Sequence, residues 1–249
     1  MAEIETREVT LPDQSKVTIR LQNGNDEDIL SRSSDSQLDN ISKFLAAIIV
    51  SPEGLTGKDI EKWKVSNKYY LLLASRVFNF GSEFTFSHTF EMNGKQVTTN
   101  FTEELDKYLV DFSNPEEVEK AKLNNPLICK PYLFGTASTR EIELPTGKKV
   151  RYEFLTGVGE NMINNIPKNQ LKINDVLRAR NLSIWDQESN TYKTIKDYAN
   201  LTSRELAIIR KDITENDFQY GMEMDIELPD GQTERSIMIQ YTEFFFPQY

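Results

Sequence analysis

Two stretches of the chain repeat one pattern of alternating apolar and polar residues at a fixed spacing. The first reads Arg7-Glu8-Val9-Thr10-Leu11-Pro12 and then Lys16-Val17-Thr18-Ile19, and the second reads Arg140-Glu141-Ile142-Glu143-Leu144-Pro145 and then Lys149-Val150-Arg151-Tyr152. The two align without a gap at an offset of 133. Alternation on both sides of a Pro-containing turn is typical of a β-hairpin with one buried face.

The correspondence resumes further along each stretch. Residues 67–77 and 203–213 are predicted to form short amphipathic helices, with Ser66 and Ser203 as N-caps. Each helix runs into an alternating segment, at residues 80–86 and 220–226. The dipeptides Asn93-Gly94 and Asp230-Gly231 follow, and they favour tight hairpin turns because both central residues tolerate a positive φ.

These patterns predict an α+β fold that contains an internally duplicated unit. Each unit consists of a β-hairpin, helices and then an antiparallel hairpin. We assign residues 1–110 to the first unit and 138–249 to the second, with a connector at 111–137. The connector contains several Asn-Pro and Lys-Pro dipeptides and is expected to form one short helix near residues 116–123.

Charge and hydropathy narrow the classes of partner. Asp and Glu outnumber Lys and Arg by 39 to 29, so electrostatic attraction to phosphate groups contributes little to binding. Neither nucleic acid nor an anionic membrane surface is therefore an expected partner. The longest apolar run, residues 44–50, is much shorter than the roughly 20 residues of a bilayer span. The charged start of the chain lacks the order of a signal peptide. We expect synthesis in a cytoplasm.

Reactive residues are scarce. Cys129 is the only cysteine and His88 the only histidine, which excludes an internal disulfide, a Cys-based zinc site and a multi-His metal site. His88 is expected on or near the strand face that carries Phe84 and Phe86. A catalytic histidine needs a nucleophile and an orienting carboxylate, and no Gly-x-Ser-x-Gly motif occurs. The sequence therefore assigns no catalytic, cofactor-binding or metal-binding residue.

Two further motifs have structural explanations. The acidic run Asp26-Glu27-Asp28, matched in the second unit only by Glu160, is interpreted as a solvated first helical turn, because a Ca²⁺ or Mg²⁺ loop spaces its carboxylates around a glycine turn. Gly157-Val158-Gly159 lacks the remaining residues of a phosphate-binding loop, and its alignment with Gly24 predicts a turn.

The last six residues concentrate aromatic side chains. Phe244, Phe245, Phe246, Pro247 and Tyr249 are candidate partner-binding residues. Consecutive rings point to opposite faces of a strand, so one sheet face cannot cover them all. Two interpretations stay open: a final strand whose rings fill the core of the second unit, and an aromatic segment that docks into a partner.

Taken together, these residues resemble the baseplate hub subunit family of T-even-type contractile-tailed bacteriophages. The features that carry the resemblance are Arg-Glu-Val/Ile-x-Leu-Pro followed by Lys-Val in both units, the segments Phe80-Gly81-x-Glu83 and Tyr220-Gly221-x-Glu223, and the terminal Phe-Phe-Phe-Pro. The resemblance implies a non-enzymatic virion or assembly protein of the tail baseplate, made in the host bacterial cytoplasm. It implies contacts with other hub and tail proteins, the tape-measure protein among them, in a symmetric assembly.

Three alternatives are kept, and one of them is a host-encoded regulator or scaffold. A tail-assembly chaperone would bind the same partners and be absent from the mature virion. A hydrolase is the rival from another class, and it would require polar groups that converge in a cleft.

Overall fold

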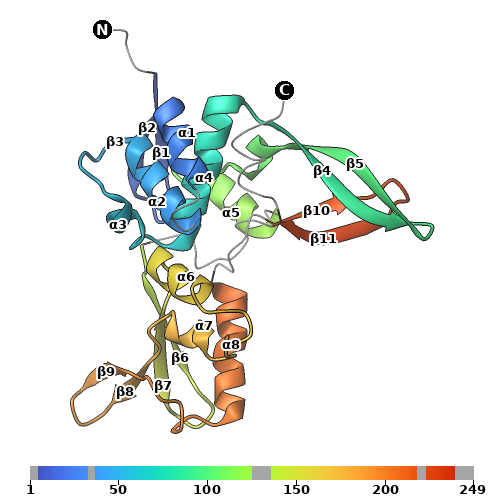
Figure 1. The fold of residues 1–249 in the computed structure, drawn as a ribbon. Coiled ribbons are helices and arrows are strands. Elements are labelled where there is room, and N and C mark those ends of the chain that lie inside the picture. Colours follow the sequence, from blue (N-terminus) through green and yellow to red (C-terminus); the bar gives the residue numbers. More distant parts are fainter. Residues whose placement is uncertain (1–4, 33–36, 125–135, 218–222, 239–249) are drawn as a thin grey trace.

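The computed structural model describes residues 5–32, 37–124, 136–217 and 223–238. Helices and antiparallel sheets alternate along the chain, so the predicted α+β class is confirmed. Figure 1 shows a first half, a second half below it, and two β-ribbons beside the first half.

The first half is built on a three-stranded antiparallel sheet in the order β1-β2-β3. It contains β1 (Thr6–Thr10), β2 (Lys16–Arg20), α1 (Gly24–Ser31), α2 (Gln37–Ile48), β3 (Ile49–Ser51), α3 (Gly57–Ile60) and α4 (Val65–Phe80). The predicted hairpin is β1–β2, which pairs Thr6 with Arg20 and Thr10 with Lys16. Val9, Val17 and Ile19 are buried on one face, as the alternation requires.

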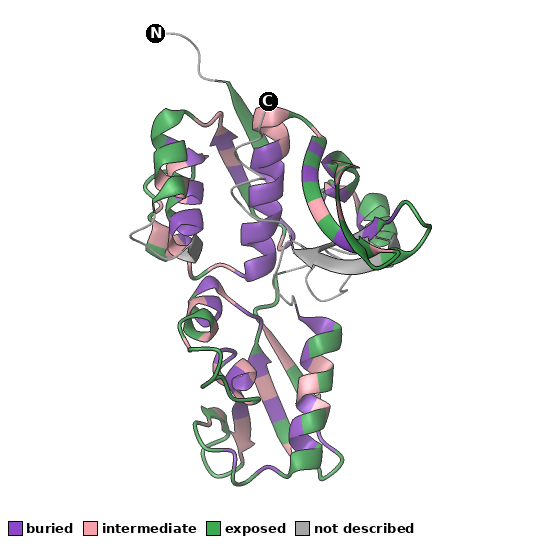
Figure 2. Ribbon diagram, turned by 45° about the vertical axis from the view of Figure 1, so that its right-hand side comes forward, coloured by how far each residue is buried: buried purple, intermediate pink, exposed green. Residues whose placement is uncertain are grey.

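Helix α4 is the central element of the first half, and the prediction of an amphipathic helix is wrong here. Every residue from 65 to 76 is buried, because α4 contacts β1, α2 and the second half (Figure 2). Its N-cap is Lys64 and not Ser66. A helix that is enclosed on all sides must also bury polar residues, and Lys68 and Arg76 are both at most 2% exposed.

A long ribbon follows α4. It is formed by β4 (Glu83–Met92) and β5 (Lys95–Glu104), which pair along their whole length and lead into the short helix η1 (Leu105–Tyr108). The predicted turn is confirmed, since Asn93 and Gly94 both have positive φ, at 54° and 73°. The helix expected in the connector is α5 (Pro115–Asn124).

The second half is built on a four-stranded antiparallel sheet in the order β6-β7-β8-β9. Its elements are β6 (Thr139–Glu143), β7 (Lys149–Glu153), α6 (Gly157–Asn164), α7 (Asp175–Arg178), β8 (Ser183–Asp186), β9 (Thr191–Thr194), α8 (Ser203–Asn216), β10 (Glu223–Glu227) and β11 (Thr233–Met238). The N-cap of α8 is Thr202, one residue before the predicted Ser203, because the Thr202 hydroxyl accepts a hydrogen bond from the Glu205 amide. In the β10–β11 turn only Gly231 has a positive φ, so Asp230 departs from the prediction.

The two halves follow the same order of elements. Strands β6 and β7 and helix α6 begin and end 133 residues after β1, β2 and α1 (139 minus 6, 149 minus 16, 157 minus 24). The elements that follow α1 and α6 differ between the halves. The long α2 precedes β3, whereas the short α7 precedes β8, and of the two sheets only the second has a fourth strand. The duplication itself stays a prediction.

The buried apolar side chains form two clusters. The smaller one lies within residues 142–213 of the second half. The larger one joins the first sheet, α2, α4 and the β4–β5 ribbon. Phe112 and Val118 of the predicted connector also belong to it, as do Ile226 and Leu228 of the second-half hairpin. The first core is thus completed by residues outside the range 1–110.

Candidate interaction surfaces

His88 lies where the sequence predicts, on the ribbon face that carries Phe84 and Phe86. It is half-buried, and its ring centre lies 6.5 Å from that of Phe90 and 6.4 Å from that of Phe101. In the described part of the chain, no group of three or more His, Cys, Asp or Glu side chains could hold a metal ion.

The acidic run in α1 is not simply a solvated turn, and this prediction is corrected for Asp26. That carboxylate is 2% exposed, and it accepts hydrogen bonds from the Arg20 guanidinium at 2.7 and 2.9 Å and from the Asn23 amide at 2.8 Å. Asp26 therefore ties α1 to β2 and closes the capping box. Glu27 and Asp28 are exposed, as expected.

The glycines of Gly157-Val158-Gly159 serve close packing, which corrects the predicted turn. Both lie in the first turn of α6. A Cβ at Gly157 would lie 2.9 Å from the Glu61 carbonyl oxygen, and a Cβ at Gly159 would lie 2.4 Å from the Ala179 carbonyl oxygen. Only glycine lets α6 approach these backbones so closely.

Helix α6 carries the main contact between the halves. Glu160 is fully buried and accepts hydrogen bonds from Lys68 Nζ at 3.1 Å and from the Tyr69 hydroxyl at 2.7 Å. Backbone hydrogen bonds surround this pair. They run from Val65 N to Leu155 O, from Gly157 N to Trp63 O and from Val158 N to Glu61 O. The two halves are therefore held in one relative position by a buried ion pair and by backbone pairing.

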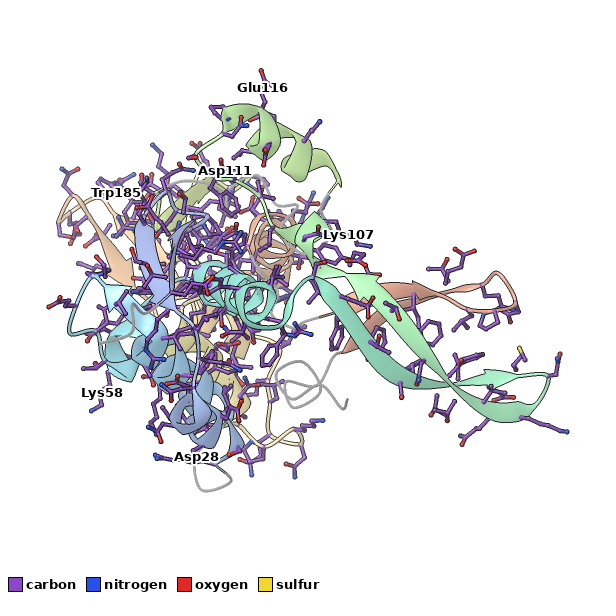
Figure 3. The ribbon with its side chains drawn as sticks, turned by 90° about the horizontal axis from the view of Figure 1, so that it is seen from above. Asp28, Lys58, Lys107, Asp111, Glu116 and Trp185 are labelled. Carbon is purple, nitrogen blue, oxygen red and sulfur yellow. The ribbon has the colours of Figure 1, made fainter. Side chains whose placement is uncertain are left out.

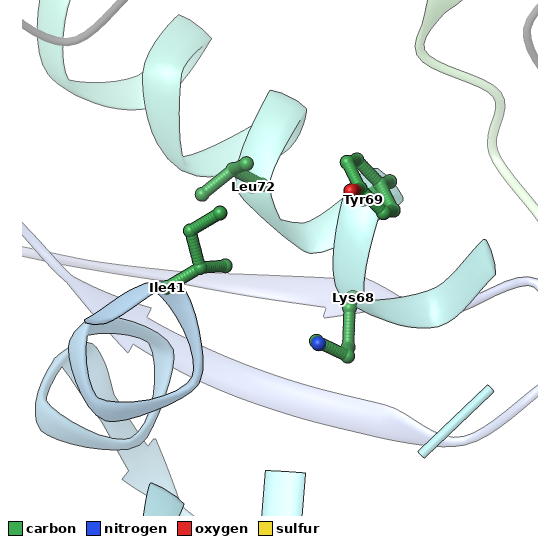
Figure 4. A pocket seen from close by; sticks show the side chains of 4 residues that line it. All are labelled: Ile41, Lys68, Tyr69 and Leu72. Carbon is green, nitrogen blue, oxygen red and sulfur yellow. The ribbon is translucent and has the colours of Figure 1, made fainter. Parts of the chain in front are cut away.

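A small apolar pocket lies beside this contact. Its lining includes Ile41 of α2 and Lys68, Tyr69 and Leu72 of α4 (Figure 4). The side chains leave no room for a water molecule. The pocket is thus a packing defect between two helices and offers no ligand site.

The β4–β5 ribbon presents a long polar face. In the view of Figure 3 it extends far to one side of the molecule, with the β10–β11 hairpin beside it. Its inner face buries Phe84, Phe86 and Phe90. The centre of its exposed outer face consists of three uncharged pairs, each joined by a side-chain hydrogen bond of 2.8 to 3.0 Å: Thr85 with Thr102, Ser87 with Asn100, and Thr89 with Thr98. Glutamates stand at its two ends, where Glu83 pairs with Glu104 and Glu91 pairs with Gln96.

The ribbon is fixed at its base. The Arg76 guanidinium of α4 donates to the carbonyl oxygens of Gly81 at 3.0 Å and Glu83 at 3.2 Å. The Tyr108 hydroxyl donates to Glu103 at 2.6 Å. A strand of ten residues is about 33 Å long, and these contacts set the direction in which the ribbon leaves the body.

A second surface lies on the outer face of the four-stranded sheet, and sequence reasoning missed it. Trp185 of β8 contacts Tyr192 of β9 edge to face, with ring centres 5.1 Å apart, and the Arg151 guanidinium lies 4.3 Å from the Tyr192 ring centre. Burial and a hydrogen bond to Glu141 raise the pKa of Tyr192. The available signal was one aromatic residue in each of two short segments, Ser183–Asp186 and Thr191–Thr194.

A shallow groove of about 370 Å³ adjoins this surface. Seven residues line it: Thr146, Gly147, Lys148, Lys149, Ile184, Trp185 and Gln187. Lys148 Nζ donates to the Asn200 carbonyl oxygen at 2.7 Å and lies 3.1 Å from Glu205. The groove thus combines two ammonium groups with an indole ring.

The predicted partner-binding residues Phe244, Phe245, Phe246, Pro247 and Tyr249 lie outside the described residues. Their role stays a prediction, with both interpretations open.

Among the described residues, no helix combines the length and the apolar character that crossing a bilayer requires. Comparison of the chain with protein-family models, with curated proteins and with solved structures finds no match.

Proposed function

We propose that this chain is a non-enzymatic structural or assembly protein of a contractile phage tail baseplate, in the hub region, that binds other tail proteins. The observation that carries the proposal is the β4–β5 ribbon, a long arm whose exposed outer face is uncharged at its centre. Such an arm suits a protein that reaches a neighbouring subunit. The sequence resemblance supplies the identity of the assembly.

The chemistry of the outer face supports a contact role. The five hydroxyl groups at its centre and the Asn100 side-chain oxygen are already hydrogen-bonded across the ribbon. A partner can therefore cover the centre of this face without leaving these hydroxyl groups unpaired, which would otherwise cost about 1–3 kcal/mol each. Uncharged pairs also avoid the larger penalty of desolvating ions.

The fixed relation of the two halves supports the same proposal. The Glu160–Lys68 contact and the backbone pairing around it hold the ribbon and the second sheet in one geometry. A subunit at a junction between rings needs surfaces at a defined separation and angle.

Mass analysis of infected cells tests the assignment to a tail. Peptides of this chain should occur in purified mature particles in a constant ratio to the major tail proteins. Their presence only in assembly intermediates would favour the chaperone alternative. Their absence from particles and from every tail intermediate would refute the proposal.

The role of the ribbon is tested separately by Asn100→Arg, which places a bulky cation at the centre of the outer face. We expect the purified variant to keep the thermal melting temperature of the wild type and the infected cells to accumulate incomplete tails. Thr6→Arg is the matched control, since Thr6 is an exposed strand residue on another sheet. Normal tail assembly by Asn100→Arg would exclude the ribbon face as the contact.

A further inference from the structure

The outer face of the second sheet gathers the residue types that dominate binding free energy at protein interfaces. Trp, Tyr and Arg are enriched among such residues, and Trp185, Tyr192 and Arg151 lie together here. The sheet register explains their proximity. Trp185 pairs with Tyr192, and the β7–β8 register that pairs Val150 with Ile184 brings Lys149 next to Trp185 on the same face.

The charges along the groove are unbalanced. Its lining includes Lys148 and Lys149 and no acidic residue. Lys148 is compensated by Glu205. Lys149 makes no ion pair within the described ranges, although Glu143 lies opposite it in register. Lys149 is thus an available cation beside an aromatic ring, on a chain whose net charge is −10.

Two further hydrogen-bond donors at the groove also favour a ligand that carries carboxylates. In the part of the chain that the structure describes, the indole N–H of Trp185 has no hydrogen-bond partner, and the Gln187 side chain also lines the groove. Ammonium and N–H groups around an aromatic ring suit a ligand that carries both carboxylates and an apolar side chain.

We propose that this groove and the adjoining Trp185–Tyr192–Arg151 face bind a short acidic segment of a partner protein. A carboxylate of the segment meets Lys149, and an apolar side chain of the segment lies against Trp185. Arg151 lies over the Tyr192 ring, with Glu141 opposite it in register. The proposal does not depend on the function proposed above.

A protein segment fits this face better than a nucleic acid does. Basic and aromatic side chains together also suit single-stranded nucleic acid. However, the excess of ten negative charges repels a phosphate backbone along its whole length, whereas a short peptide meets only the local field.

The first half lacks this surface, which gives the proposal a matched control. Its sheet has three strands, and Thr18 stands at the position that corresponds to Arg151. Lys16 corresponds to Lys149, at the first position of the second strand, but it is paired with Glu8 at 2.7 Å.

The test is a titration of a fluorescein-labelled, capped peptide in which glutamates flank one leucine, followed by fluorescence anisotropy. The full chain should bind this peptide, and Lys149→Glu and Trp185→Ala should each weaken binding about tenfold or more. Lys16→Glu should bind as the wild type does. Thermal melting of every variant verifies that the fold is intact, and Trp185→Phe replaces Trp185→Ala if the latter unfolds.

Three results would overturn the proposal. The first is the absence of binding to the wild type at about 1 mM peptide. The second is equal binding by Lys149→Glu and the wild type, or equal binding of the peptide that carries glutamines in place of the glutamates. The third is tighter binding of a single-stranded oligothymidine than of the acidic peptide.

Discussion

At the scale of single residues, three hairpin turns share one backbone geometry, and this geometry favours glycine at one position. Leu11–Ser15, Leu144–Lys148 and Leu228–Gln232 each begin with Leu-Pro and share the same two backbone hydrogen bonds. The fourth residue of each turn has a positive φ, at 73° for Gln14, 80° for Gly147 and 79° for Gly231. Gln14 therefore carries a strain that the two glycines avoid.

We expect Gln14→Gly to stabilise the chain by about 0.5–1 kcal/mol, since relief of the left-handed strain, about 1–2 kcal/mol, exceeds the added entropy of an unfolded glycine. The midpoint of urea unfolding measures the change. Gly231→Ala is the converse variant. No heavy atom lies within 4 Å of the added Cβ, so any loss of stability in this variant is due to backbone strain and not to a steric clash. An unchanged or lower midpoint for Gln14→Gly would contradict this account.

At the scale of elements, helix ends connect the helices to the sheets. Glu205 in the first turn of α8 accepts hydrogen bonds from the Thr146 hydroxyl at 2.5 Å and from the Thr202 amide at 2.7 Å. Together with Lys148 these donors lower the pKa of Glu205 from 4.5 to about 2. The capping box thus also joins α8 to the β6–β7 turn.

The lowered pKa predicts a pH dependence of stability. The ionised Glu205 contributes fully above its unfolded pKa of 4.5, and the contribution is lost as the pH falls towards about 2. Glu205→Gln should therefore be less stable than the wild type at pH 7, and the difference should shrink between these two pH values. Glu215→Gln, on the exposed side of the same helix, should show no such convergence in urea unfolding. A constant difference at every pH would exclude the interpretation.

At the scale of the whole molecule, the two proposed contact surfaces lie at opposite ends. In Figure 1 the β4–β5 ribbon extends from one side of the first half, and the β8–β9 hairpin extends from the other side of the second half. Figure 3 likewise separates Trp185 from the ribbon. The buried contact of Lys68 with Glu160, at 1% and 0% side-chain exposure, determines how these ends are oriented.

Removing one partner of this ion pair should destabilise the molecule strongly. Glu160→Gln leaves the Lys68 ammonium buried without a counter-charge, and we expect a loss of about 3–5 kcal/mol in unfolding free energy. Adding Lys68→Met should restore much of the loss. Glu27→Gln is the control, because Glu27 is the exposed residue at the corresponding position of α1. A wild-type urea midpoint for Glu160→Gln would disprove the role of the pair.

The sequence by itself determined the local elements of this protein. Alternation around a turn is a short-range property, so the hairpins at β1–β2 and β6–β7, the Asn93-Gly94 turn and the helix of the connector were all predictable. The position of His88 on an aromatic strand face followed from the same period of two.

Only the tertiary structure decided which polar residues are buried and which surfaces form. Glu27 and Glu160 occupy corresponding positions, yet one is exposed and the other is enclosed, because Glu160 meets Lys68 and Tyr69 of α4. Trp185, Tyr192 and Arg151 meet through strand pairing across three strands, which no local pattern encodes. Burial and proximity depend on contacts between segments far apart in the chain, and periodicity describes only neighbours along it.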